Sequence, residues 1–171
     1  MVGYAVVDIT IFSGTQRLIF LAACTIMGYN LSKEATKMDC VFCKILNGEL
    51  PCSKLYENDT TIAIMDIADD VDGHILVIPK KHFKNILDCD SDTLHDMMDT
   101  VQKVSRHLVD NCGYDGVNLL NASDESAGQS VPHFHIHIIP RKRNDGIDGW
   151  PVFRGAKKSY SYHFEKLKMN G

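Results

Sequence analysis

Three histidines alternate with apolar residues in the segment 133–139, which reads HFHIHII. In an extended strand the side chains at i, i+2 and i+4 share one face. His133, His135 and His137 would therefore point to one side, and the apolar residues between them to the other. A buried face with three unpartnered imidazoles would cost a few kcal/mol for each ring. The pattern therefore indicates a functional site, either one that acts on a substrate or one that only binds a metal.

The residues just before these histidines favour phosphate chemistry. Gly128, Gln129 and Ser130 offer backbone N–H groups and a hydroxyl, which together suit an anionic phosphate. A strand that only binds metal does not need such a loop. A neutral imidazole attacks phosphorus well, and it divides one difficult displacement into two easier ones through a covalent phosphoramidate. The histidine segment is therefore predicted to act on a phosphate.

A second group of residues has the types that bind zinc. Cys40 and Cys43 form a CxxC pair, and His82 and His133 follow further along the chain. Two thiolates and two imidazoles suffice for a tetrahedral zinc. Taken alone, the CxxC is also compatible with a redox pair or with an incidental feature of a helix.

The elements that must position these residues indicate an α+β domain with an antiparallel sheet. Apolar spacing and end signals predict helices, while short β-branched runs between turn residues predict strands. The segment from Arg154 to Gly171 is too basic and broken to predict an element. The expected elements are a short helix Cys40–Asn47, strands Thr61–Ile67 and His74–Pro79, a long helix Ser91–Cys112, and strands Gly116–Asn121 and His133–Ile139, the last ended by Pro140.

Composition favours a small-molecule partner and a reducing compartment. The chain has 171 residues and a formal charge of −4, and its pI is near 6.0. A surface for a nucleic-acid duplex would be basic, so none is expected. Apart from the close pair Cys40 and Cys43, the six cysteines are scattered, unlike the dense framework of a small secreted domain, and we therefore predict a cytoplasmic protein.

The N-terminal region is predicted to lie outside the domain. Leu18–Met27 is apolar but too short to span a bilayer, so no membrane partner is expected. The sequence around Cys24 is similar to a lipoprotein cleavage box, although the segment before it lacks a basic start. The alternative is that Met38 is the true start. We expect an extension over residues 1–37, one domain over 38–145 and a tail over 146–171.

The segment 133–139 matches every position of the pattern His-φ-His-φ-His-φ-φ, with φ apolar, and so resembles the histidine triad (HIT) family. The family's other landmarks follow in order from about Asp39 to Arg141, with Asp66 in a strand, His74 opening HILVIPKKH, and Asn121 before the GQS loop. The resemblance implies a five-stranded antiparallel sheet with one long and one short helix.

The resemblance also implies roles for individual residues. The nucleophile would be His135, with His137 and Ser130 acting on the phosphate and leaving group; His74 would be either a catalytic relay or a structural histidine. Asp66 would hold the ribose hydroxyls. Asn121, Gly128 and Gln129 would contact the phosphate. A structural zinc, one per chain, would bind Cys40, Cys43, His82 and His133. The base would contact Val41, Phe42, Ile45, Ile64 and Ile67, which ordinary core packing explains equally well.

The function implied is hydrolysis at the α-phosphate of a nucleotide, foremost as a purine nucleoside phosphoramidase. A dinucleoside polyphosphate hydrolase and a non-catalytic nucleotide-binding partner protein are the alternatives. A zinc-dependent nucleic-acid module is disfavoured, because no strand interleaves aromatic and basic residues. The resemblance further implies a homodimer. Trp150 would either reach toward the partner's site or pack on its own domain.

Overall fold

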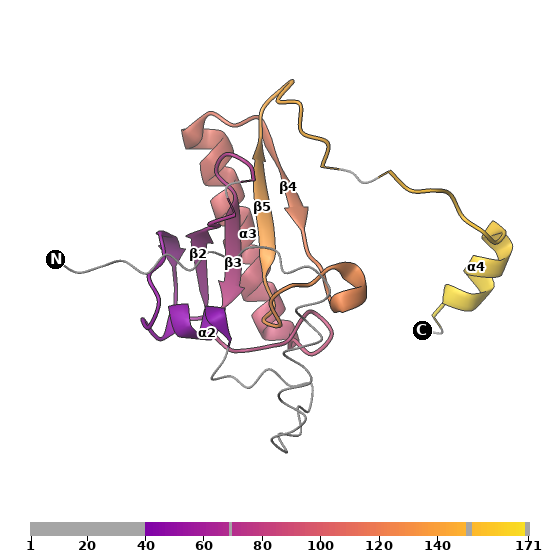
Figure 1. Ribbon diagram of the computed structural model, residues 1–171, viewed down its shortest axis with the longest axis horizontal. Helices are drawn as coiled ribbons and strands as arrows, with labels where there is room; N and C mark the ends of the chain where they lie inside the picture. The colour runs from indigo at the N-terminus through magenta and orange to yellow at the C-terminus, as the bar shows by residue number, and fades with distance from the viewer. Residues whose placement is uncertain (1–39, 69, 150–151, 170–171) are drawn as a thin grey trace, which may run out of the picture. The chain divides into compact units, whose positions relative to one another are not determined.

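A computed structural model describes residues 40–68, 70–149 and 152–169, and these contain a five-stranded antiparallel sheet with strand order β1-β2-β3-β5-β4 (Figure 1). The predicted α+β class with one long helix is confirmed. The extension 1–37 and Trp150 lie outside the described residues. The elements are α2 Val41–Leu46, β1 Lys54–Glu57, β2 Thr61–Met65, β3 Ile75–Pro79, α3 Ser91–Cys112, β4 Gly116–Leu120, the 3-10 turn η1 Glu125–Ala127, β5 Ile136–Arg141 and α4 Tyr160–Leu167.

Helix α3 has the predicted bounds because the sequence defines both of its ends. The Asp90 side chain accepts a hydrogen bond from the backbone N–H of Thr93 at 2.8 Å, which caps the first turn. Gly113 ends the helix in the left-handed region, at φ 75°, where glycine has no Cβ penalty. The apolar stripe between these ends packs on the sheet, and Figure 1 shows α3 running along it.

The sheet has an apolar cluster on each face, and the two clusters have different partners. On one face Ile75 and Val77 of β3 pack with α3. On the other face Leu76 and Ile78 pack with α2 and its cysteines. The register pairs Leu76 with His137, and directly paired residues face the same side. The triad histidine of β5 therefore lies on the α2 face.

Strand β5 differs from the predicted strand at both of its ends. It begins at Ile136 rather than His133, because the backbone N–H of Phe134 bonds the carbonyl of Phe83 at 2.7 Å, outside the ladder. It also runs through Pro140, which was expected to end it. Pro140 pairs with β4 and lies beyond Ile138, the last residue of β5 that pairs with β3, so its missing N–H breaks no ladder bond.

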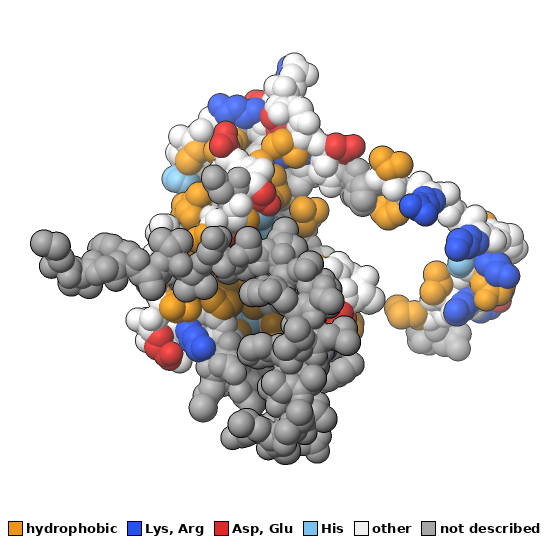
Figure 2. Space-filling model, viewed as in Figure 1, with side chains coloured by type: hydrophobic (Ala, Val, Ile, Leu, Met, Phe, Trp, Pro, Cys, Tyr) orange, Lys and Arg blue, Asp and Glu red, His pale blue; other side chains and the backbone are white. Residues whose placement is uncertain are grey.

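Strand β1, the turn η1 and helix α4 were not predicted individually. Strand β1 is a four-residue edge strand with mostly exposed side chains and an irregular register, so no alternation marks it in the sequence. Helix α4 is capped by Ser159, whose side chain accepts a hydrogen bond from the N–H of Tyr162. Figure 2 shows basic and hydrophobic side chains together on this C-terminal segment. None of the helices in the described ranges is long and apolar enough to cross a membrane.

Candidate active site and zinc cluster

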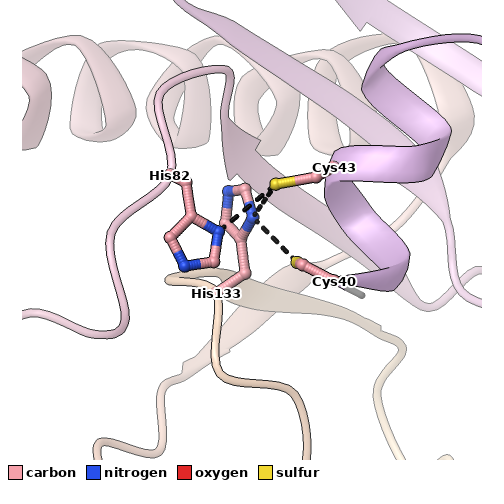
Figure 3. A group of neighbouring side chains, drawn as sticks. All are labelled: Cys40, Cys43, His82 and His133. Atoms are coloured by element: carbon pink, nitrogen blue, oxygen red, sulfur yellow. Dashed lines mark hydrogen bonds between the residues drawn. The ribbon is translucent and has the colours of Figure 1, made fainter. Parts of the chain in front are cut away.

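Cys43 of α2, Cys40 at the N-cap of that helix and two histidines of distant loops meet in one cluster (Figure 3). The Cys40 Sγ lies 3.3 Å from His133 Nδ1, and the Cys43 Sγ lies 3.3 Å from His82 Nδ1 and 3.6 Å from His133 Nδ1. In a tetrahedral zinc site with usual bond lengths, sulfur and nitrogen ligands lie about 3.5 Å apart. The spacing of these atoms therefore fits a zinc ion.

The surroundings of His133 prepare it to be a ligand. Its Nε2–H donates to the carbonyl of Pro79 at 3.0 Å, which leaves the lone pair on Nδ1, the atom that faces the two sulfurs. Such a carbonyl partner is the usual means of orienting a metal-binding imidazole. Burial lowers the pKa of His133 to about 4, so the neutral ligand form predominates. Four protein ligands would close the site to water, as in structural zinc sites.

The ring of His135 is held in one tautomer. Its Nδ1–H donates to the carbonyl of His133 at 2.7 Å. Because a carbonyl can only accept, the neutral ring has its lone pair on Nε2, and Nε2 makes no hydrogen bond within the described residues. The Asn121 side chain donates to the carbonyl of His135 at 2.8 Å, and the Phe42 ring packs edge-on with centroids 5.1 Å apart. The backbone and ring of His135 are therefore both fixed.

His137 belongs to a chain of polar contacts that ends at two carboxylates. Its Nδ1 lies 2.8 Å from His74 Nε2, and His74 Nδ1 lies 2.8 Å from Asp70 Oδ1. Asp66 Oδ2 lies 3.5 Å from His74 Nε2. Burial and the neighbouring imidazoles of His135 and His74 lower the pKa of His137 to about 4. The hydrogen bond with His74 holds the pKa of Asp70 below its usual value.

The sequence did not single out Asp70. The available signal was an aspartate four residues before His74 in an Asp-rich turn. A turn leaves open which of its carboxylates faces inward, and the backbone conformation decides this.

Hydrogen bonds of Gln129 fix the shape of the loop that precedes the three histidines. The Gln129 side chain donates to the carbonyls of Lys84 and Val131 at 2.6 and 2.9 Å, and accepts from the N–H of Asp124 at 2.7 Å. Its backbone N–H bonds Asp124 as well. Gln129 therefore shapes the loop, while the neighbouring Ser130 is exposed to solvent.

A family model described as the HIT domain matches residues 47–144. The chain belongs to the HIT family. An adenylylsulfatase of Arabidopsis thaliana is 44% identical over 75% of this chain and 62% of its own length. An adenosine 5'-monophosphoramidase of Schizosaccharomyces pombe is 37% identical over 78% of this chain and 94% of its own length.

Solved HIT structures share the fold. A HIT family member from Bacillus subtilis, 34% identical, superposes with a TM-score of 0.65 over 78% of this chain and 99% of that chain. A zinc-bound histidine triad protein from Mycobacterium smegmatis, 33% identical, gives 0.63 over 66% and 82%. The Cys–His cluster of this HIT domain is compatible with zinc.

The residues that the resemblance assigned to the base lie in different environments. Phe42 and Ile64 are buried in the cluster on the α2 face, and Ile45 packs against it partly buried. Val41 and Ile67 are exposed, Ile67 by 91%. The HIT domain thus brings three of the five together in one cluster, in which the Phe42 ring contacts His135, whereas Val41 and Ile67 face solvent.

Proposed function

We propose that this protein is a nucleotide hydrolase in which His135 Nε2 attacks the α-phosphate and becomes transiently nucleotidylated. The observation that carries the proposal is the 2.7 Å hydrogen bond from His135 Nδ1–H to the carbonyl of His133. This bond leaves the lone pair on Nε2 without any need for a separate base. A non-catalytic nucleotide-binding protein would not need a nucleophile held in one tautomer.

The reaction proceeds in two displacements. The His135 Nε2 forms a bond to phosphorus as the bond to the leaving group breaks, and the leaving group takes a proton. Water then attacks the phosphoramidate, releasing a nucleoside monophosphate and restoring the imidazole. Ser130 and the N–H groups near Gly128 stabilise the phosphate oxygens. Asp66, whose side chain is 15% exposed, binds the ribose hydroxyls.

The names of relatives support an adenosine phosphoramidate as the substrate. Adenosine 5'-monophosphoramidases of S. pombe, Candida albicans and Saccharomyces cerevisiae are 37%, 36% and 34% identical to this chain. The adenylylsulfatase of A. thaliana favours adenylyl sulfate as a second candidate. In the hydrolysis of either substrate, the leaving group departs from the phosphate of adenylate. The same nucleophile can therefore carry out both reactions.

The test is parallel incubation with adenosine phosphoramidate, adenylyl sulfate and diadenosine tetraphosphate, with products separated by chromatography. We expect AMP from the phosphoramidate at the highest kcat/KM. Faster hydrolysis of diadenosine tetraphosphate would assign the protein to the dinucleotide hydrolases. Binding of AMP with no turnover of any substrate would overturn the proposal.

The Cys–His cluster supports a structural zinc, one per chain, held by Cys40, Cys43, His82 and His133. A zinc held by these four residues would tie α2 to the loop after β3 and to the segment before β5, and its role would be structural. The cluster adjoins the candidate active site, because the backbone carbonyl of His133 accepts the hydrogen bond from the ring of His135.

A homodimer is the proposed assembly. Strand β4 is an edge strand with Leu119 and Leu120 exposed by 45% and 44%, and edge strands are usually covered or paired. Light scattering at micromolar concentration should give twice the chain mass of 19.2 kDa, and a clean monomer mass would contradict the dimer. The domain bounds 38–145, the cytoplasmic compartment and the role of Trp150 remain predictions.

A further inference from the structure

We propose that Asp70, together with Asp66, keeps one additional proton on the His74–His137 pair, so that His137 presents an Nε2–H donor to the leaving group. This rests on the proposed function, since it concerns how the leaving group departs. In this role Asp70 is a positioning residue, acting through His74. The argument depends on which ring nitrogen has a proton in each state of the chain Asp70–His74–His137.

A neutral pair would present the wrong atom. The Asp70 carboxylate can only accept, so the 2.8 Å contact requires a proton on His74 Nδ1. A neutral His74 then has its lone pair on Nε2 and must accept from His137 Nδ1–H across their 2.8 Å contact. A neutral His137 protonated on Nδ1 has no proton on Nε2. It therefore has no proton to give to a departing amine.

One additional proton corrects this. If the proton is on His74, that ring donates through Nε2 to His137 Nδ1, and the neutral His137 must have its proton on Nε2. If the proton is instead on His137, both nitrogens of that ring are protonated. Either arrangement places an Nε2–H on the triad strand. The two carboxylates lie against the His74 ring, Asp70 at 2.8 Å and Asp66 at 3.5 Å, so the proposal places the additional proton on His74.

The charges around His74 favour the cationic pair. His74 is 8% exposed, and the groups that face it are Asp70 at 2.8 Å, Asp66 at 3.5 Å and the imidazole of His137. Two carboxylates this close stabilise a positive charge. Asp70 is itself 57% exposed, so solvent screens its charge. We therefore expect the stabilisation that Asp70 gives to the cationic pair to be at the low end of the range usual for ion pairs.

The proton balance closes over one turnover. As His135 Nε2 bonds to phosphorus and the P–N bond breaks, the His137 Nε2 proton goes to the leaving nitrogen, which departs as an amine. His74 Nε2–H then moves to His137 Nδ1, leaving a neutral pair. In the second step water attacks phosphorus, its proton goes to His137 Nε2, and the pair returns to its cationic state. No oxidant or further reactant is needed.

The first test compares two leaving groups in Asp70→Asn, in which the amide oxygen can still accept from His74 but the charge is gone. The substrates are an adenosine alkylphosphoramidate, whose amine must be protonated, and adenosine 5'-(p-nitrophenyl phosphate), whose phenolate leaves without a proton. We expect kcat for the amidate at pH 7 to fall about 10-fold and its alkaline limb to move about one pH unit lower. The ester should change less than about 2-fold. Asp72→Asn, two residues along the same turn and exposed, is the matched control and should resemble the wild type.

Equal losses for both substrates would show a merely structural role for Asp70, and no change for either would show no role; both results overturn the proposal. Should the wild type turn over neither substrate, the proposed function fails, while imidazole ¹⁵N NMR still tests the pair. At pH 7 we expect His137 protonated on Nε2 in the wild type and on Nδ1 alone in Asp70→Asn. The Nδ1-only tautomer in both proteins would overturn the inference.

Discussion

The histidine segment has two ends with different chemistry, although both have histidines on the same face. The first end is His133, and the second end is His135 and His137. At the first end, both ring nitrogens of the fully buried His133 have partners, the Pro79 carbonyl on one side and two sulfurs on the other. At the second end, His135 uses only one ring nitrogen, on the carbonyl of His133. His137 is tied to His74 and its carboxylates.

The difference shows that spacing determines which residues meet, whereas the neighbours determine what each residue does. A carbonyl opposite one nitrogen turns the other nitrogen toward a ligand or a substrate. Whether that second nitrogen meets thiolates or stays available to a substrate then separates a structural metal site from a catalytic one. The predictions below alter one end at a time.

The largest effect is expected at the catalytic end. His135→Ala removes the nucleophile, and kcat should fall by at least about 10⁴-fold. Nucleotide affinity and Tm should change little, because the apolar core contacts of this segment come from the residues between the histidines. Turnover and AMP binding by calorimetry check this. Comparable turnover in the variant would assign the chemistry to another residue.

Much of this contrast could be predicted from the sequence. The alternation of histidines and apolar residues in 133–139 is a local signal. Its prediction of two faces is correct although β5 starts only at Ile136, because Phe134, Ile136 and Ile138 all pack on the α3 face. The CxxC and two histidines were likewise marked by residue type. The role of Gln129 in closing the loop, and the contact of Asp70 with His74, depend on turn conformations that residue types alone leave open.

The next largest effect is expected at the zinc end. The double variant Cys40→Ser, Cys43→Ser should lose bound zinc and unfold about 10 °C lower, because metal binding is coupled to folding. Metal analysis and thermal unfolding measure both quantities. Cys112→Ser, at an exposed cysteine, is the control and should retain zinc and Tm. Wild-type protein prepared without chelator that contains no zinc would contradict the assignment.

A smaller effect is expected from removing the hydrogen bond that holds the backbone of His135. Asn121→Ala removes the donor to the His135 carbonyl, and the ring should lose alignment with phosphorus. We expect kcat to fall about 10-fold with zinc content unchanged. Asn111→Ala, on the exposed side of α3, is the control. An unchanged kcat in Asn121→Ala would show that the bond does not position the nucleophile.

The smallest effect is expected from a variant that changes neither the zinc cluster nor the catalytic histidines. Asp90→Ala removes the cap of α3 and should lower Tm by a few degrees at pH 7 without altering zinc content or kcat. Hydrogen bonds from Lys81 and the Thr93 N–H lower the pKa of Asp90 to about 2. The folded state thus favours the carboxylate, so its stabilisation is full above about pH 4 and is lost as the pH falls toward 2. Thermal unfolding across that window checks this, and a Tm difference that grows on acidification would contradict it.

The central claim, a nucleotidyl group on His135, is tested most directly by intact-protein mass spectrometry of acid-free quenched reactions with adenosine 5'-(p-nitrophenyl phosphate), whose phenolate leaves without a proton from His137. His137→Ala should slow breakdown of the intermediate and show a mass increase of one adenylyl group, which peptide mapping locates on His135. The His135→Ala variant should show no increase. An adduct that persists in His135→Ala, or turnover by the wild type with no adduct in any quench of His137→Ala, would contradict covalent catalysis by this residue.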